Sequence, residues 1–318
     1  MSKNIEKGPQ FEASIEKKER EEVKAEEAEI RKAYERRLEL IPESLRTPGL
    51  MLHFSKPENA EFILKHGILS YARYVERFGK EPPVGAGSDM QTVFGAWDYI
   101  SVMDVYRGCG HTPWFFEARK EANKRIQQAI KDHESTSRRH IARGFEGRGI
   151  TLEEFLKPEN KLLRKKINRI LEETMYRDEP LEVPPKDYVD WKTTEPASEP
   201  KIIKDVLQYF GFRYGAITFL INPQLKRITC PGLTSYDESF IKDEIKPGDI
   251  VGMVVTFSVY IIGGKVVAVD KDEEIFRLAE ILARKNGVPL FVATVTLTYD
   301  ENKRFKDKKT EVSQKEVV

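Results

Sequence analysis

The sequence contains few cysteines, no long apolar run and no excess of charge of one sign, and each absence excludes a class of protein. Its two cysteines, Cys109 and Cys230, are far apart and form no C-x-x-C pair, so neither a disulfide scaffold nor a cysteine metal site is expected. No apolar stretch approaches the roughly 18 residues of a membrane span, and the charged N-terminus does not resemble a signal peptide. A net charge of +1 gives the whole chain no strong attraction to anions. We therefore expect a cytoplasmic protein without membrane contact.

The chain divides into a charged N-terminal segment, a main domain and a charged tail. Residues 1–40 intersperse Glu with Lys and Arg, which favours a helix through i,i+4 pairs. Their apolar positions are too few for a sustained heptad pattern, so we expect a solvated helical or disordered segment. A coiled coil, or a helix that binds an inhibitory or assembly partner, is the alternative. Residues 41–300 are assigned to the main domain, which is long enough to bury a large core, and residues 301–318 to a disordered charged tail.

A basic helical insertion is expected at about 112–205 of the main domain. Between residues 119 and 169 the sequence has fifteen Lys or Arg against seven Asp or Glu. Such an excess of positive charge could follow a phosphate backbone, and a charged, solvated insertion is the other interpretation. The histidines of this region, His111, His133 and His140, have no spacing that fits a metal site, so no metal is expected.

The stretch from Leu50 to Ser70 predicts a short buried strand that runs directly into a helix. Ser55 and Glu58 have the spacing of a capping box, and Gly67 is a natural end for the helix. His53 is then a polar residue near the end of a hydrophobic strand, beside a capped helix. Such positions often carry function in open sheets.

A second strand is predicted from Trp97 to Val105, with Tyr99 and Ser101 on the same face. A tyrosine ring can stack on a flat ligand ring, and a serine hydroxyl can bond a ribose. The alternative is an ordinary strand tyrosine whose hydroxyl faces water.

The last hundred residues predict a series of strands. Glu238 begins one of them, and a buried strand starts at Ile250 after a turn. Gly263 and Gly264 indicate a hairpin, and Gly287 ends a helix that precedes a final strand.

Two of these stretches together resemble motifs of the ADP-ribosyltransferase superfamily. The first motif is a hydrophobic–His–hydrophobic–Ser/Thr strand before a helix that ends I-L-x-x-G-I-L, here Leu52-His53-Phe54-Ser55 followed by 63–69. The second is an apolar strand with N-P, a gap, and then E-x-h-h-x-x-x-I-x-P-x-x-I-x-G-h-h-h, which begins here at Glu238. The motifs lie in the family's order and far apart in the chain.

The resemblance implies a role for each of these residues. His53 and Ser55 would hold the adenosine-side ribose of NAD, and Tyr99 or Ser101 would lie under the nicotinamide end. Glu238 would be the catalytic carboxylate. The chain departs from the family in having no E-x-E, because Tyr236 stands two residues before Glu238, which puts arginine-directed transfer in doubt. Glu244 is a rival carboxylate six residues further on.

The resemblance also implies a fold and a reaction. We expect an α+β domain in which two mostly antiparallel sheets pack around an NAD cleft, with the helical insertion beside them. The expected activity is NAD-dependent ADP-ribosyl transfer to a macromolecular acceptor, either protein or nucleic acid, with NAD as the substrate. Two alternatives stay open: a catalytically silent binding module of the same fold, and a nucleic-acid-binding protein that acts through the basic insertion.

Overall fold

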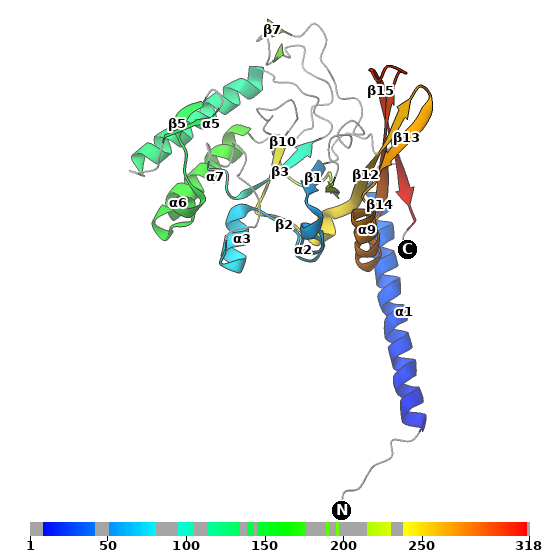
Figure 1. The fold of residues 1–318 in the computed structure, drawn as a ribbon. Helices are drawn as coiled ribbons and strands as arrows, with labels where there is room; N and C mark the ends of the chain where they lie inside the picture. The colour runs from blue at the N-terminus through cyan, green and yellow to red at the C-terminus, as the bar shows by residue number, and fades with distance from the viewer. Residues whose placement is uncertain are drawn as a thin grey trace, which may run out of the picture.

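The structure is a computed structural model in which much of the chain is described. The described residues are 9–41, 51–80, 95–104, 113–133, 139–142, 145–175, 189–190, 195–196, 215–229 and 238–316. They form a mixed α+β fold with a large, mostly antiparallel sheet and several helices, which confirms the predicted fold class at this level (Figure 1). Much of the expected connector between residues 176 and 214 lies outside the described residues, as do Cys109, Cys230 and Tyr236.

The large sheet has nine strands in the order β15-β14-β12-β8-β1-β3-β10-β9, with β13 paired to β12 off this path. Its strands are β1 (Met51–Ser55), β3 (Tyr99–Asp104), β8 (Ile217–Ile221), β9 (Ile228–Thr229), β10 (Glu238–Lys242), β12 (Ile250–Ile262), β13 (Lys265–Asp270), β14 (Leu290–Tyr299) and β15 (Phe305–Lys315). All its pairings are antiparallel except that of β12 with β14. The described strands thus correct the expectation of two packed sheets, because β8 pairs with both β1 and β12 and joins them into one sheet.

Three further strand pairs are small and separate. They are β2 (Ile68–Leu69) with β11 (Glu244–Ile245), β4 (Arg139–Ala142) with β5 (Phe145–Arg148), and β6 (Val189–Asp190) with β7 (Glu195–Pro196).

Helices cover both faces of the large sheet. They are α1 (Pro9–Glu39), α2 (Ala60–His66), α3 (Tyr71–Phe78), α5 (Pro113–Asp132), α6 (Leu152–Leu156), α7 (Lys161–Met175) and α9 (Glu273–Asn286). On one face α2 and α9 pack in a core with Phe219 and Met253. On the other face α5, α6 and α7 pack over Tyr99 and Phe240, whereas the end of α1 packs near Leu220.

The helical insertion is part of the hydrophobic core rather than a solvated decoration. Ile126 of α5 and Ile167 of α7 are fully buried with Tyr99 of β3. This corrects the expectation of a solvated insertion, since the apolar residues of both helices face the sheet. We call α5, α6 and α7 the helical block.

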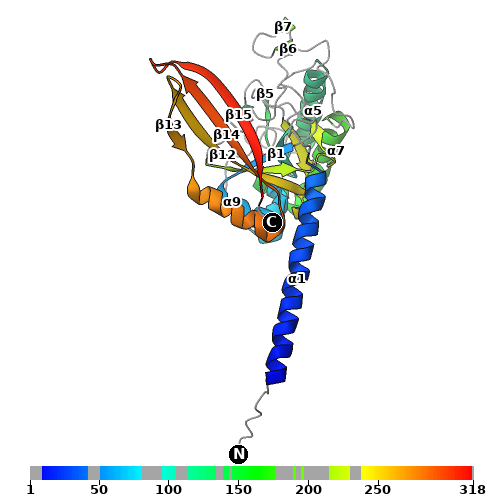
Figure 2. The same cartoon turned by 90° about the vertical axis from the view of Figure 1, so that its right-hand side faces the viewer.

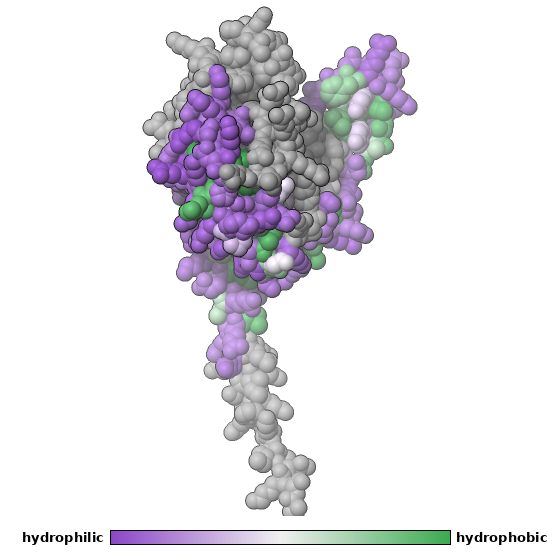
Figure 3. Space-filling model, turned by 90° about the vertical axis from the view of Figure 1, so that its left-hand side faces the viewer, coloured by the Kyte–Doolittle hydropathy of each residue, from purple (hydrophilic) through white to green (hydrophobic). Residues whose placement is uncertain are grey.

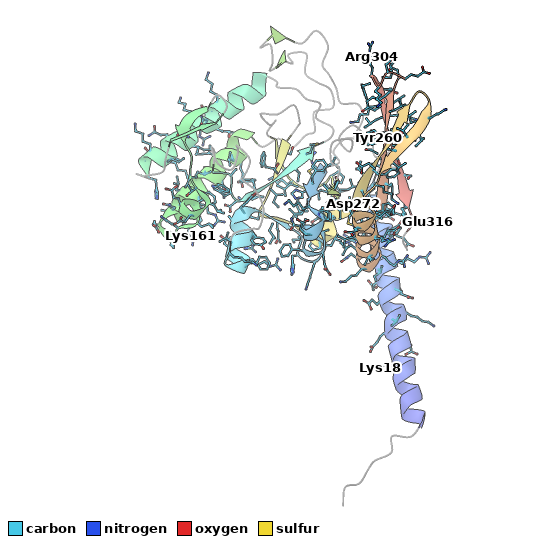
Figure 4. All side chains as sticks on the ribbon, viewed as in Figure 1. Lys18, Lys161, Tyr260, Asp272, Arg304 and Glu316 are labelled. Atoms are coloured by element: carbon cyan, nitrogen blue, oxygen red, sulfur yellow. The ribbon has the colours of Figure 1, made fainter. Side chains whose placement is uncertain are left out.

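Helix α1 has two halves with different surroundings. Its first part projects from the body of the molecule (Figures 1 and 2), and Lys18, labelled in Figure 4, is exposed there. Its last turns are docked, because Arg37 donates hydrogen bonds of 2.7 Å to the carbonyl oxygens of Asn286 and Gly287 at the end of α9. A side chain at Gly287 would meet the Ile30 carbonyl oxygen at 2.5 Å, so the two helices approach closely. The expectation of a segment wholly outside the core is therefore corrected for its second half.

Several local predictions are settled by the backbone. Gly67 ends α2, as predicted, and has a φ of 82°. The predicted hairpin turn at Gly263 and Gly264 joins β12 to β13. The capping box predicted at Ser55 is absent: Ser55 is the last residue of β1, and Lys56 takes the N-cap position without a side-chain cap.

The C-terminal tail is also different from its prediction. Residues 305–315 form β15, which pairs with β14 along its whole length. A charged segment can form such an edge strand because both of its faces reach solvent over much of its length.

Candidate functional site

Three strands from distant parts of the chain meet at the candidate site. Strand β3 lies between β1 and β10, so Leu52 is the partner of Met103 and Met103 is the partner of Glu238. Position 238 is therefore in line with position 52 across the sheet. The Glu238 side chain lies outside the described part of the structure. Its backbone lies two strands away from Leu52, the residue that precedes His53 in β1.

His53 connects β1 to β3 just beyond the last backbone pair of the two strands, Leu52 with Met103. Its Nδ1 lies 3.2 Å from the carbonyl oxygen of Ser101. A carbonyl only accepts hydrogen bonds, so Nδ1 must carry a proton. Burial lowers the pKa of the His53 imidazole, and the hydrogen bond to Ser101 opposes part of this shift. The net lowering of the pKa favours the neutral ring. Ser55, two residues on, is half-buried, and its hydroxyl accepts a 3.4 Å hydrogen bond from the Asn59 side chain.

Tyr99 is almost completely buried, with 1 % of its surface exposed. Its ring packs against the helical block, and its hydroxyl lies 3.5 Å from a carboxylate oxygen of Glu172 in α7. Burial, together with the nearby carboxylates of Glu172, Asp98 and Asp243, raises the pKa of this phenol. Neither ring face is open to a flat ligand, so the described packing fits neither stacking on a ligand nor a hydroxyl in open water.

A cavity of about 600 Å³ lies where β10, α7 and the segment after β8 meet. Its lining residues are Tyr99, Arg169, Glu172, Glu173, Leu225, Lys226, Arg227, Phe240, Ile241, Lys242 and Glu244. This volume is within the usual range for small-molecule sites, and the lining combines apolar side chains with many charged ones.

The charged groups of the cavity are partly paired with each other. Lys242 lies 2.5 Å from Glu172. Glu173 pairs with Arg125 at 2.5 Å and with Arg169 at 2.6 Å, and these two arginines lower the pKa of its carboxyl. The walls carry four cations and three carboxylates, so the cavity suits a ligand that combines a planar or apolar part with an anionic group.

Side chains alternate between the two faces of the sheet along each strand, and this alternation determines which predicted site residues share a face. Tyr99, Ser101 and position 238 belong to the rows that face the helical block, because Tyr99 and Phe240 pack there. His53 is paired with Phe219, which packs on the opposite face with α2 and α9. The structure thus gathers three of the five predicted positions on the side of the cavity, and connects His53 to them through the Ser101 carbonyl.

Sequence reasoning missed two residues of the site and a network that supports it. Lys242 could have been found, because it follows Phe240 at the two-residue spacing of a strand face. Glu172 gave no signal, since it lies on an ordinary charged helix. The same holds for Arg164 of α7, which forms a bidentate ion pair with the buried Asp98 and donates a 2.5 Å hydrogen bond to Glu76.

Comparison with known proteins yields no match: no protein-family model, no curated protein and no solved structure is significantly similar to this chain. Among the described residues, no helix is long and apolar enough to cross a membrane. The same residues contain no cluster of three or more His, Cys, Asp or Glu side chains arranged for a metal ion.

Proposed function

We propose that this protein is an NAD-dependent ADP-ribosyltransferase that modifies a macromolecular acceptor. The observation that carries the proposal is the adjacency of β1, β3 and β10, which come from three distant segments. This order brings the two stretches that resemble the superfamily to β1 and β10, on either side of β3 and its Ser101. Two unrelated strands of a nine-stranded sheet would not need to lie so close.

The proposed chemistry needs one well-placed carboxylate. The bond between nicotinamide and ribose breaks through an oxocarbenium-like state, as in glycoside cleavage. Nicotinamide is a good leaving group, so no strong acid is required. A carboxylate at position 238 would stabilise the developing positive charge and could orient the acceptor nucleophile.

The cavity supplies groups that suit the rest of NAD. Arg227 and Lys242 lie on its wall and are able to meet a pyrophosphate. Ser101, on the same face, is suited to a ribose hydroxyl. Because the Tyr99 ring is enclosed, we assign Tyr99 the role of shaping the cavity through its hydroxyl and Glu172, instead of stacking on nicotinamide.

His53 enters the proposal in one of two ways that kinetics can separate. It either contacts the adenosine ribose together with Ser55, as the resemblance implies, or supports Ser101 through its hydrogen bond. A ribose contact is uniform binding, so His53→Ala would raise KM more than it lowers kcat. A supporting role would lower kcat, because it acts on the strand that lies beside position 238.

The experiment is nicotinamide release from labelled NAD in the presence of protein and nucleic-acid acceptors. Glu238→Gln should keep the fold and lower turnover about 10²- to 10³-fold, the usual loss for one preorganised electrostatic group. Glu244→Gln tests the rival carboxylate, which lies six residues along in β11 and lines the cavity, and its turnover should stay close to that of the wild type. Melting temperatures of both variants check folding.

Full activity of the Glu238 variant would refute the proposed mechanism. Loss in the Glu244 variant alone would move the catalytic assignment to that residue. Tight NAD binding without nicotinamide release in the wild-type protein would instead favour the silent binding module.

A further inference from the structure

The outer part of the large sheet extends beyond the helices that cover its centre. It consists of β13, the first half of β15 and the ends of β12 and β14, residues 258–270 and 295–309, and we call it the arm (Figures 1 and 2). The tips of its two hairpins are adjacent, because the Gly263 N–H donates a 3.1 Å hydrogen bond to the Tyr299 carbonyl. Hydrophobic and hydrophilic residues lie next to each other on the arm, as the space-filling view shows at its upper right (Figure 3).

An exposed aromatic ring lies at the tip of the arm. Phe305, the first residue of β15, has 57 % of its surface exposed. Its ring meets Tyr299 edge to face, with 5.8 Å between the centroids and an interplanar angle of 75°. The contact holds the Phe305 ring in place while more than half of its surface stays open. A fixed and open aromatic ring is a stacking platform for another flat group.

Basic residues flank Phe305 in the sequence. Lys303 and Arg304 precede it, and neither side chain forms an ion pair with another described residue; Arg304 is labelled at the tip in Figure 4. Lys306 follows it and lies 3.7 Å from Asp300. The Asp300 carboxylate is already engaged, since it also accepts a 2.9 Å hydrogen bond from the Arg304 backbone.

The remaining charges at the tip leave it positive. Lys265 at the start of β13 and Lys308 and Lys309 further along β15 add to the cations, and Lys309 pairs with Glu311. The opposing carboxylates are Asp300, Glu301 and Asp307. From residue 299 to 309 the chain carries five basic and three acidic side chains, a balance that favours a polyanion around the Phe305 ring.

We propose that the arm tip binds single-stranded nucleic acid. The Phe305 ring would stack on an unpaired base, and Lys303, Arg304 and Lys306 would meet the phosphates on either side. Stacking with flanking cations is the general mode of sequence-tolerant single-strand binding. A duplex hides its base faces, so it offers nothing to the ring. An acidic peptide would use the cations alone and leave the ring without a partner. The proposal does not depend on the proposed transferase activity.

The helical block is the competing surface for nucleic acid, and its charges are less available. Arg125 and Arg169 pair with Glu173, Lys166 pairs with Asp132, and Arg164 is held by Asp98 and Glu76. Phosphates that met these four side chains would have to displace carboxylates. At the arm tip Lys303 and Arg304 have no such competitor among the described residues.

The test is fluorescence anisotropy of the full-length protein with labelled oligo(dT), oligo(U) and a mixed-sequence duplex across a salt series. Both single strands should bind, and the duplex should bind more weakly. Phe305→Ala should weaken single-strand binding roughly 5- to 100-fold, the range for one base–aromatic stack, and Phe305→Trp should restore it. The double variant Lys303→Gln/Arg304→Gln should lower the slope of log K against log salt by about 1.4, because each lost phosphate contact removes about 0.7.

Two control variants test whether the effect belongs to the tip. Val267→Ala removes another exposed hydrophobic side chain of the arm and should leave binding unchanged. Lys120→Gln/Lys124→Gln removes two exposed cations of α5 and should also be silent. The proposal is overturned by absent single-strand binding at low salt, by duplex or poly-glutamate binding as tight as single-strand binding, by unchanged binding in the Phe305→Ala protein, or by a loss confined to the α5 variant.

Discussion

The helical block and the arm are both rich in lysine and arginine, but they present these residues in opposite ways. In the helical block the basic residues lie on helices whose apolar sides are buried against β3 and β10. Packing of α5 on α7 brings their carboxylates within reach, so Arg125 and Lys166 are paired across the two helices. The arginines of this block are therefore largely paired with carboxylates above a packed core, whereas Lys120 and Lys124 of α5 are exposed.

The arm has long strands and little cover. All six residues of β13 are exposed, and no described helix lies over the tips of the hairpins. Its cations project from an edge strand and a turn, where only local carboxylates can reach them. The comparison shows that the number of basic residues in a stretch does not tell how much positive charge it offers to a partner. What decides is whether neighbouring elements bring acidic side chains to them.

The largest expected difference between the two regions concerns their phenylalanines. Phe155 of the helical block is fully buried, and Phe155→Ala should lower the free energy of unfolding by about 3–5 kcal/mol. Phe305→Ala on the arm should change it by about 0.5 kcal/mol or less, because the ring is already exposed. Urea denaturation of both variants measures this contrast. Equal losses would mean that the arm is as tightly packed as the block.

The next prediction concerns two arginines. Arg164 holds Asp98, whose side chain is only 2 % exposed, and Arg164→Ala should destabilise the fold by about 3 kcal/mol because a buried carboxylate loses its partner. Asp98→Asn in the same protein should recover part of this loss. Arg304→Ala should be close to neutral, since no described carboxylate is paired with its side chain. An Arg304 variant that unfolds as easily as the Arg164 variant would contradict the comparison.

A pH titration tests the strand pair that connects the two regions. Strand β1 joins the half of the sheet that bears the arm to the half under the helical block, and His53 bonds Ser101 across that joint. Its pKa is lowered in the folded protein, so its neutral form contributes stability above the ordinary pKa of 6.5, and this is lost as the pH falls through the lowered value.

The expected contribution is a slope of at most about 1.4 kcal/mol per pH unit between the ordinary pKa of 6.5 and the lowered value. His53→Gln should remove the His53 part of this slope while keeping an amide donor for Ser101. The measurement is the unfolding free energy of both proteins between neutral and mildly acidic pH. Identical profiles would show that His53 titrates as it does in the unfolded chain.

The smallest expected effects are alike in the helical block and in the helix that follows the arm strand β13, because they depend only on local backbone geometry. Thr151 caps α6 in a reciprocal capping box with Glu154, and Asp272 caps α9 by accepting from the backbone N–H groups of Glu274 and Ile275. Thr151→Ala and Asp272→Ala should each cost about 1 kcal/mol. Thermal melts of the two variants give the comparison, and a loss several times larger in one of them would show that the cap also supports distant contacts.

Much of the sheet could be predicted from the sequence, because its central strands are apolar and its turns carry glycine. The strand at β8, the end of α2 at Gly67 and the end of α9 at Gly287 follow from such local signals. The strand β15 could not be predicted in this way, because a solvated edge strand lacks the alternating apolar residues that mark a strand in a sequence.

The candidate site was harder to predict than the sheet. The spacing of Tyr99 and Ser101 placed both on one strand face, but it could not tell whether that face meets a helix or a ligand. Packing of Ile126 and Ile167 over Tyr99 decided it, and these contacts join residues distant in sequence. The cavity has the same origin, since α7 and β10 form its walls together only in the folded protein.

The docking of α1 on α9 has a consequence for the order in which the chain assembles. Arg37 bonds the Asn286 carbonyl, a partner 249 residues further along the chain. Strand β1 likewise can pair only after β8, which lies far along the chain, has been made. In contrast, β12, α9, β14 and β15 follow one another in sequence, so their contacts require only short loops to close. During synthesis this unit is made after helix α1, but its strands have the shorter search for their partners. Helix α1 is thus made well before α9, the surface on which it docks.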